Sequence, residues 1–419
     1  MTMAINGRTH QAAPGALVLG SDYKSLGIVR SLGRHGIPVW VLQDEHALAG
    51  YSRYCVRTLS WPAVGEAERV HYLRELSERN AIEGWTLFPT DDEAAALLAR
   101  NRRALGERYR LTVPRWPVLR WAYDKRLTYR LAAGLDIDHP RTHYPQSAED
   151  LRSLDVRYPA ILKPAIRTEL NRFTMSKAWR IEDSAELAAR YAEASALIDP
   201  SLIMVQELIV GGGACQLSYA ALCREGRPVA SVVARRTRQW PMDFGRASTY
   251  VETIEAPDVE EIATRLLAVL GYEGIVEVEF KRDPRDGRLK LLDINPRVWG
   301  WHTLAGRAGV DFPYLLWRMT TGASVPEIRG RSGIRWVRAL TDVPTALGEI
   351  RAGRLSVGAY LSSLRGPIEF AILAADDPVP ALIEVPAALY LAWWRRASMR
   401  RDTPEPISAP MPSGQGASQ

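Results

Sequence analysis

Apolar and polar positions along the first part of the chain follow the pattern of alternating strands and helices. An apolar run at Ala16–Leu19 precedes a polar turn, residues 20–22, and an amphipathic pattern near 24–35. A second apolar run follows at 37–42. Strand, turn, helix and strand within about 30 residues predict a parallel βαβ unit.

The same alternation continues to the end of a first lobe. A third strand is expected around 85–89, followed by Thr90-Asp-Asp-Glu and an Ala- and Leu-rich helix. A Pro- and Trp-rich connector at 114–117 closes an open α/β lobe over 15–117. The first turn has one glycine where a dinucleotide fingerprint has three. A nicotinamide-dependent dehydrogenase is therefore disfavoured, and failure of NAD to shift the thermal unfolding midpoint would exclude it.

Beyond residue 117 the pattern changes to hairpins mixed with helices, which indicates an α+β unit over 118–325. Strands are expected at 158–163, 177–181, 202–209, 216–223, 275–282 and 289–294, and helices at 124–133, 185–196 and 259–270. Helical patterns dominate from 303 to about 394, so 326–400 is expected to be a helical extension. The polar ends, 1–14 and 401–419, are expected to be disordered.

One predicted hairpin carries acidic side chains on a single face. The turn sequence Asp283-Pro-Arg-Asp-Gly287 joins its two strands. A register centred on Asp286 places Glu279 opposite Asp293 and Glu277 opposite Asn295. Side chains of alternate residues share a face, so the four groups are expected to lie together.

This acidic face predicts a metal site. Close carboxylates raise each other's pKa unless a cation neutralises them, and oxygen ligands suit Mg²⁺. No histidine or cysteine accompanies them, so zinc is disfavoured. The alternative is a solvated face whose charges are matched by Lys281, Arg282 and Lys290.

Basic residues at the ends of predicted elements suggest phosphate contacts. Lys163 ends an apolar strand and Lys125 begins a helix, so both can reach an anionic ligand at a loop mouth. Arg297 follows the acidic hairpin and could bind a phosphate or carboxylate with both guanidinium nitrogens. Arg235 and Arg236 belong to a basic stretch that could meet phosphate or an anionic substrate.

Composition narrows the classes of protein without naming one. The chain has 47% hydrophobic and 24% charged residues, a net charge of +6, and six lysines against 48 arginines. Because the arginines are spread along the chain, nucleic-acid binding is disfavoured. Where arginine fills most basic positions, each lysine is more informative, because it is more often one that arginine cannot replace.

Cysteine usage and apolar run lengths bear on the cellular setting. Three cysteines form no Cys-x-x-Cys pair, which fits a reducing cytoplasm. No apolar run reaches the roughly 20 residues of a membrane helix. The nearest, 379–394, is interrupted by Glu384 and Pro386 and is followed by arginines. We favour a helix packed on the body over one lying on a membrane surface.

The ordered set of motifs resembles the ATP-grasp superfamily, in particular its carboxylate–amine ligases. The matching stretches are Asp124-Lys125, Ala160-Ile-Leu-Lys163-Pro164, Gln206-Glu-Leu-Ile-Val-Gly-Gly212, Glu277-Val-Glu279-Phe280 and Asp293-Ile-Asn295-Pro-Arg297-Val-Trp-Gly300. A further stretch, 305–322, resembles members acting on amino acids or cell-envelope precursors, including D-aspartate-ligase-like proteins. The resemblance covers about 15–325.

The resemblance implies a pre-ATP-grasp α/β domain at 15–117 and a two-lobed ATP-grasp domain at 118–325 that clasps ATP. It implies the following contacts: Lys125 and Lys163 on ATP phosphates; Lys177 elsewhere on the nucleotide; Gln206, Glu207 and Ile209 along the adenine; Gln216 near the ribose; Glu279, Asp293 and Asn295 on Mg²⁺ or Mn²⁺. Arg297 and Lys163 would act on the reacting groups. Arg235, Arg236 and His302 are the substrate candidates.

The implied activity is an ATP- and Mg²⁺-dependent ligase of the cytoplasm that joins a carboxylate to an amine or similar nucleophile. Its substrates would be small molecules, cell-envelope precursors among them, and the sequence leaves open whether it forms homo-oligomers. The alternative is a catalytically inactive ATP-binding regulatory or scaffold protein. A loop at 165–176 without glycine, and Ala214-Cys-Gln216 in place of an acidic ribose contact, favour that alternative.

Overall fold

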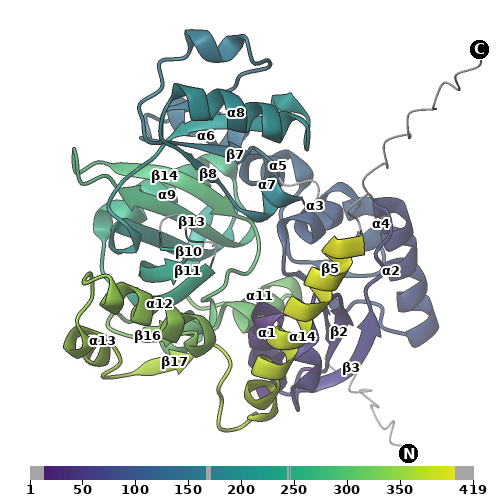
Figure 1. Cartoon of the computed structure of the whole chain (residues 1–419). Coiled ribbons are helices and arrows are strands. Elements are labelled where there is room, and N and C mark those ends of the chain that lie inside the picture. Colours follow the sequence, from purple (N-terminus) through teal and green to yellow (C-terminus); the bar gives the residue numbers. More distant parts are fainter. Residues whose placement is uncertain (1–13, 167–170, 243–244, 246, 402–419) are drawn as a thin grey trace, which may run out of the picture.

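A computed structural model describes residues 14–166, 171–242, 245 and 247–401, with side chains to residue 390. The tails expected to be disordered therefore lie outside the described residues, except for Pro14 and Arg401. Part of the loop at 165–176 also lies outside them. Three sheets organise the described chain, and Figure 1 shows how they lie relative to one another.

The first sheet has five parallel strands in the order β3-β2-β1-β4-β5. Its elements are β1 (Ala16–Leu19), α1 (Tyr23–Arg34), β2 (Val39–Gln43), β3 (Cys55–Ser60), α2 (Glu66–Asn80), β4 (Thr86–Pro89), α3 (Asp92–Arg100), α4 (Arg102–Gly106) and β5 (Arg110–Leu111). The predicted βαβ unit is confirmed. The two outer strands, β3 and β5, were not predicted, because neither shows an alternating apolar pattern.

A four-stranded antiparallel sheet follows in the order β6-β9-β7-β8. Its elements, with the helices leading into it, are α5 (Trp116–Tyr123), α6 (Lys125–Gly134), β6 (Thr142–His143), β7 (Ala160–Pro164), α7 (Arg172–Met175), β8 (Trp179–Ile181), α8 (Ser184–Ser195) and β9 (Ile203–Glu207). Asp183 caps α8 by accepting a hydrogen bond from the Glu186 N–H. Apolar residues of α8, such as Leu187 and Tyr191, pack on the sheet.

The third and largest sheet has eight strands. Seven run in the order β14-β13-β10-β11-β12-β16-β17, and β15 pairs with β11. The elements are β10 (Gln216–Arg224), β11 (Arg227–Trp240), β12 (Ala247–Thr253), α9 (Pro257–Leu270), β13 (Gly274–Arg282), β14 (Leu289–Asn295), α10 (Thr303–Arg307), α11 (Phe312–Thr320), β15 (Ile328–Arg329), β16 (Arg335–Val337), α12 (Ala339–Arg351), α13 (Val357–Ser363), β17 (Ile368–Phe370) and α14 (Val379–Arg401).

The segment expected to be a helical extension contains strands as well as helices. β15, β16 and β17 add to the large sheet, so residues 328–370 are partly built into the same sheet as the acidic hairpin. Each of these strands has only two or three residues, which is too short to give a period-2 pattern. None of the helices in the described residues is long and apolar enough to cross a membrane.

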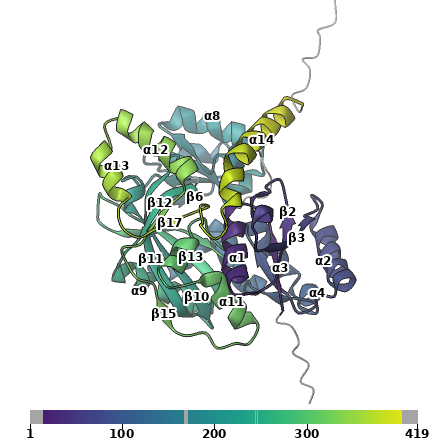
Figure 2. The same cartoon turned by 90° about the horizontal axis from the view of Figure 1, so that it is seen from below.

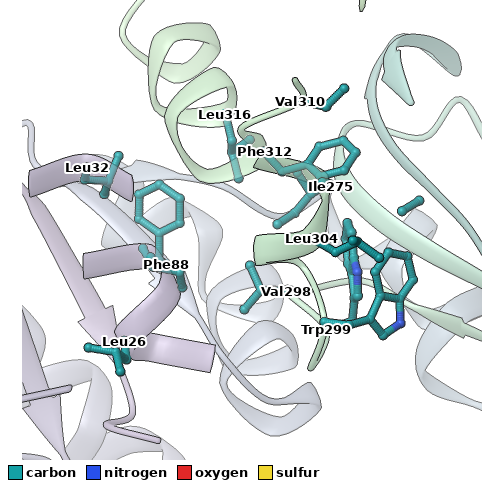
Figure 3. Packing of buried hydrophobic residues seen from close by; sticks show 14 of the residues in the cluster. Leu26, Leu32, Phe88, Ile275, Val298, Trp299, Leu304, Val310, Phe312 and Leu316 are labelled. Atoms are coloured by element: carbon teal, nitrogen blue, oxygen red, sulfur yellow. The ribbon is translucent and has the colours of Figure 1, made fainter. Parts of the chain in front are cut away.

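A continuous apolar cluster joins the first lobe to the large sheet. Leu26, Leu32 and Phe88 of the first lobe belong to the same cluster as Trp299 and Phe312. Figure 3 shows Val298 between the side chains of the first lobe and Trp299. A second cluster places α9 and Ala132 of α6 against the other face of the large sheet. The first lobe is therefore held firmly beside the acidic hairpin.

Candidate active site

The acidic hairpin forms in the predicted register. β13 pairs with β14 so that Glu279 lies opposite Asp293 and Glu277 lies opposite Asn295. The register shifts by one residue between Glu279 and Phe280, toward the turn. The prediction therefore holds at the end of the hairpin where the four polar side chains lie.

Glu279 is the most heavily bonded carboxylate of this group. It accepts hydrogen bonds from Asn295 Nδ2 at 2.8 Å, Gln216 Nε2 at 2.9 Å and Arg236 Nη1 at 2.5 Å. Burial alone would raise its pKa, but the charges of Arg236 and Lys177 and the Asn295 bond hold the pKa of Glu279 well below its ordinary value. Glu279 is therefore an anion.

Glu277 has the opposite shift. Burial and the neighbouring Glu279 charge raise the pKa of Glu277, although Arg236 counteracts them. Trp301 Nε1 donates to one Glu277 oxygen at 3.0 Å and Asn295 Nδ2 to the other at 3.0 Å. Two carboxylates this close repel each other when both are charged, so they lose their protons at different pH values. Glu279 is the stronger acid of the two.

Three lysines from separate parts of the chain lie around the same space as this acidic group. Lys125 Nζ, at the start of α6, lies 2.9 Å from Asp293 Oδ1. Lys163 Nζ of β7 donates to the Tyr129 hydroxyl at 3.1 Å, and Lys177 Nζ donates to the Gly245 carbonyl at 3.1 Å. Despite burial, the Asp293 charge raises the pKa of Lys125 above its ordinary value, so this lysine stays charged.

A cavity of about 340 Å³ gathers these groups. Its lining includes the predicted residues Lys125, Lys163, Lys177, Gln206, Glu207, Ile209, Gln216, Arg236, Glu279, Asp293, Asn295 and Arg297. Residues of the four-stranded sheet, the large sheet and the first lobe all contribute. The volume and the mixed polar and apolar walls are those of a small-molecule site.

The end of β9 and the residues that follow it form one wall of the cavity. Gln206, Glu207 and the buried Ile209 line it. Glu207 is paired with Arg285 and Lys290, and its backbone N–H donates to Arg141. A strand end with apolar neighbours and fixed backbone groups can hold a flat heterocycle by its edge.

The chemistry of the acidic group fits Mg²⁺ only if other oxygens share the coordination. The described residues contain no group of three or more His, Cys, Asp and Glu side chains placed to hold a metal ion. Glu279 and Asp293 face one another across the hairpin, and three lysines border the same cavity. Mg²⁺ commonly takes one or two carboxylates and completes its shell with phosphate oxygens and water, which suits this pair.

Arg297 is oriented by the first lobe. Its Nε donates to Asp92 Oδ1 at 2.9 Å and its Nη2 to Asn295 Oδ1 at 3.1 Å. Asp92 is the first residue of α3, and Asp91 caps that helix by accepting from Ala94 N–H. The pKa of Arg297 is raised by Asp92, against the effect of burial, so its charge is permanent.

Two of the substrate candidates, Arg235 and His302, do not line the cavity. Arg235 points to the other side of β11, where it pairs with Glu252 at 2.8 Å, because successive residues of a strand alternate faces. His302 is buried against Gly27, with Nδ1 2.9 Å from the Trp299 carbonyl oxygen. Burial lowers the pKa of His302 to about 4, so it is neutral.

The cavity also has lining residues that the sequence did not single out. These are Tyr23, Lys24, Asp92 and Tyr123, which enter from the first lobe and α5. Trp299 and Gly300, which belong to the predicted motif after β14, and Trp301 next to them also line the cavity. Gly300 has no room for a side chain, because the Tyr23 hydroxyl lies 2.5 Å from where its Cβ would be. Lysine rarity was the available signal: five of the six lysines, all among the described residues, line this cavity.

Comparison with known proteins identifies the fold. Residues 216–342 match the family model described as ATP-grasp in the biosynthetic pathway with Ter operon. Over 342 residues the chain is 23% identical to the carbamoyl phosphate synthase large chain of Myxococcus xanthus, covering 75% of this chain and 30% of that protein. The Methanobrevibacter smithii protein of the same name is 21% identical over 200 residues, covering 45% of this chain and 18% of that protein. The chain thus spans less than a third of the length of these curated relatives.

Solved structures resemble most of the chain. The L-amino acid ligase from Bacillus licheniformis superposes with a TM-score of 0.58 at 16% identity, over 74% of this chain and 75% of that one. The biotin carboxylase domain of Hydrogenobacter thermophilus 2-oxoglutarate carboxylase was solved with MgADP and bicarbonate. It gives a TM-score of 0.60 at 14% identity, over 76% of this chain and 73% of that one. N5-carboxyaminoimidazole synthetase from Staphylococcus aureus gives 0.57 at 14% identity, over 75% and 79%.

Proposed function

Because the chain has the ATP-grasp fold and so confirms the predicted resemblance, we propose that it is an ATP- and Mg²⁺-dependent ligase joining a carboxylate to an amine or similar nucleophile. The observation that carries the proposal is the convergence of opposed carboxylates, three lysines and Arg297 on one cavity. ATP has the charge and shape for such a cavity. The Mg–ADP in the Hydrogenobacter structure supports the same ligand here.

In the proposed reaction, a carboxylate oxygen attacks the γ-phosphorus of ATP as the bond to ADP breaks, giving an acyl phosphate. The amine nitrogen then attacks the acyl carbon, inorganic phosphate leaves, and the amine loses a proton to solvent. Positioning and charge neutralisation lower both barriers. Mg²⁺ bound by Glu279, Asp293 and Asn295 would neutralise phosphate charge and align it.

The chain's own residues divide this work by position. Lys125, Lys163 and Lys177 would neutralise the phosphates, and the end of β9 would hold the adenine. Lys125 is paired with Asp293 in the structure. When a metal cation binds Asp293 in its place, the Lys125 ammonium can pair with a phosphate instead. Arg297 would hold the transferring group and the acyl phosphate. The domain limits 15–117, 118–325 and 326–400 remain part of this proposal.

ADP release by purified protein tests the proposal. A panel of amino acids and dicarboxylates is supplied as carboxylates and amines, with ADP measured by a coupled assay. We expect release with at least one pair, loss on metal chelation, and recovery with Mg²⁺ or Mn²⁺. Glu279→Ala should abolish release and weaken Mg–ATP binding, whereas Glu255→Ala, an exposed glutamate outside the cavity, should not.

The same measurements distinguish an active ligase from the catalytically inactive alternative. Tight Mg–ATP binding without ADP release for any pair would favour a regulatory or scaffold protein of this fold. Equal ATP binding by wild type and Glu279→Ala would show that the metal-site assignment is wrong.

A further inference from the structure

The first lobe reaches the cavity from one edge of its parallel sheet. In the order β3-β2-β1-β4-β5 the chain leaves β1 toward β2 and leaves β4 toward β5, so the strand order reverses between β1 and β4. Ligands of open parallel α/β sheets bind beyond the carboxyl ends of the strands at such a point. The helices that follow these two strands begin at Tyr23 and Asp92, and both residues line the cavity. Figure 2 shows α1 at the boundary between the first lobe and the large sheet.

Lys24, the second residue of α1, presents an ammonium group at this edge. Its Nζ donates to the Thr90 carbonyl oxygen at 2.8 Å and lies 3.1 Å from Asp22 Oδ2, and the residue lines the cavity. An ammonium has three N–H donors, so it can make these two contacts and also donate into the cavity. Burial and the nearby Arg297 charge oppose the charged form, but the charge of Asp22 raises the pKa of Lys24 above its ordinary value. Lys24 is therefore a cation.

The ring of Tyr23 forms part of the wall beside Lys24. Its hydroxyl lies against Gly300, and both residues line the cavity. Arg338 lies over the face of the ring, with its guanidinium carbon 4.1 Å from the ring centroid. Arg338 precedes α12 and pairs with Glu384 of α14 at 3.4 Å. The C-terminal segment therefore holds the Tyr23 ring in place, although neither Arg338 nor Glu384 lines the cavity.

Tyr23 and Lys24 border the part of the cavity that the nucleotide leaves over. In the proposed function, on which this inference rests, the end of β9 holds the adenine, three lysines hold the phosphates and Arg297 holds the transferring group. Tyr23 and Lys24 enter from the first lobe together with Asp92, which orients Arg297. They are therefore placed beside the group that receives the phosphate.

We propose that Lys24 and Tyr23 form the subsite for the carboxylate that is phosphorylated, and that Arg338 positions Tyr23 within it. The Lys24 ammonium and the Tyr23 hydroxyl both donate to carboxylate oxygens, and a hydrogen bond between charged groups is strong. Asp22, which pairs with Lys24, does not line the cavity, so the ammonium can meet the substrate from the other side. The helix starts themselves do not bind this anion, because Asp22 and Asp91 cap them.

Carboxylate binding without turnover tests the subsite. The full chain is saturated with Mg–ADP and titrated in a calorimeter with each member of the panel of amino acids and dicarboxylates. We expect at least one of them to bind the wild type. Lys24→Gln should weaken that binding about tenfold or more and change the Kd for Mg–ADP by less than about twofold. Arg34→Gln is the matched control, because it removes the same charge from the exposed end of the same helix, and it should bind as the wild type does.

The same titration tests the role of Arg338. Arg338→Gln should weaken carboxylate binding about threefold or more, because the Tyr23 ring loses the cation over its face. Arg338→Lys keeps a cation there and should recover most of the affinity. Wild-type carboxylate binding by Arg338→Gln would show that Arg338 does not position Tyr23.

Three outcomes would overturn the subsite. In the first, no member of the panel binds the wild type, and in the second, Lys24→Gln binds the carboxylate as tightly as the wild type does. In the third, Lys24→Gln loses affinity for a non-hydrolysable Mg–ATP analogue but not for the carboxylate, which would assign Lys24 to the γ-phosphate. Thermal unfolding midpoints establish that the variants fold. If Lys24→Gln does not fold, Tyr23→Phe replaces it, with an expected loss of about threefold.

ADP release separates this inference from the ligase proposal. A protein that binds a carboxylate through Lys24 but releases no ADP with any pair would retain the subsite and lose the proposed reaction. ADP release with the same KM for the carboxylate in wild type and Lys24→Gln would retain the reaction and exclude the subsite.

Discussion

Arg297 takes its orientation from Asp92, a residue 205 positions earlier in the chain. The carboxylate accepts hydrogen bonds from two guanidinium nitrogens, at 2.9 and 3.4 Å, and so holds the plane of the group over the cavity. A fixed guanidinium can stabilise charge that develops in a transition state without reorganising first. The first lobe therefore acts on the reacting end of the site through one carboxylate.

Asp92→Asn is expected to lower kcat by about tenfold or more, with the KM for ATP nearly unchanged, because small misplacements of a catalytic group are costly. Steady-state ADP release measures both constants. Asp92→Glu should restore part of the loss. Glu93→Gln, next in the chain and 68% exposed, is the control and should behave as the wild type. An equal loss in Asp92→Asn and Glu93→Gln would show that α3 supports the site only structurally.

Glu277 should make stability depend on pH. Its folded pKa is raised by burial and by Glu279, so between about pH 4.5 and neutrality folded Glu277 keeps a proton that the unfolded chain has lost. The free energy of unfolding therefore falls as pH rises through this window. Glu277→Gln removes that term and keeps an acceptor for Trp301. Its thermal midpoint relative to wild type should rise with pH; a difference that is constant from pH 5 to 8 would contradict the assignment.

Some site residues could be found from sequence and others could not. Glu279, Asp293 and Asn295 could, because strand parity places their side chains on one face and the predicted pairing holds at their end of the hairpin. Parity could also have separated Arg235 from Arg236, but β11 had not been recognised as a strand. Asp92 could not, since its partner lies across a lobe boundary that no local pattern records.

At the scale of elements, the hairpin β13–β14 depends on its turn. Gly287 has φ of 72°, its N–H donates to Asp283, and nothing lies within 4 Å of where a Cβ would be. Backbone conformation alone therefore makes glycine favourable there. The register shift beside Glu279 lies between this turn and the site, so the turn and the acidic face are aligned separately.

Gly287→Ala is expected to lower the free energy of unfolding by about 1 kcal/mol through backbone strain. Gly134→Ala is the matched control: it also has open space around the added Cβ, but it ends α6 without a positive φ. The control should be neutral or slightly stabilising. Urea denaturation followed by tryptophan fluorescence compares the two. A similar loss in both would show that backbone strain at the positive φ of position 287 is not the cause.

Long, strongly patterned elements such as β1, α1, α9 and β13 were predicted within a few residues. β11 and β12 were missed, although they form the middle of the large sheet. Both carry polar residues whose partners lie on other elements, for example Arg236 with Ser248 of β12 and Arg238 with Asp342 of α12. Such residues look like loop residues until their partners are known.

At the scale of the whole molecule, the chain after β17 returns to the first lobe. Asp377 is buried and accepts hydrogen bonds from Arg30 Nε, Ser52 Oγ and the Arg53 N–H. Arg30 also donates to the carbonyl oxygens of Ile372 and Asp377. This contact joins residues 347 positions apart, which no local sequence pattern could predict.

Arg30→Ala should destabilise the protein by about 3–5 kcal/mol, because it leaves Asp377 buried without its cation. Arg34→Ala is the control: its pair with Asp376 is about 40% exposed on both sides, so about 1 kcal/mol or less is expected. Urea denaturation gives the two changes. Limited proteolysis should cut Arg30→Ala faster within 371–378. Equal losses in the two variants would show that the buried pair contributes no more to the free energy of unfolding than the exposed pair does.

The distribution of lysines has a practical consequence for labelling. None of the six is exposed, and the exposed basic side chains of the described residues are arginines and histidines. Reagents that acylate primary amines scatter over the surface of most proteins, but here the side-chain amines lie in or beside a single cavity. Lysine acylation by a mild reagent would therefore report on that cavity, and mass spectrometry would measure it without any variant. A nucleotide that occupies it would shield nearly every reactive side-chain amine at once.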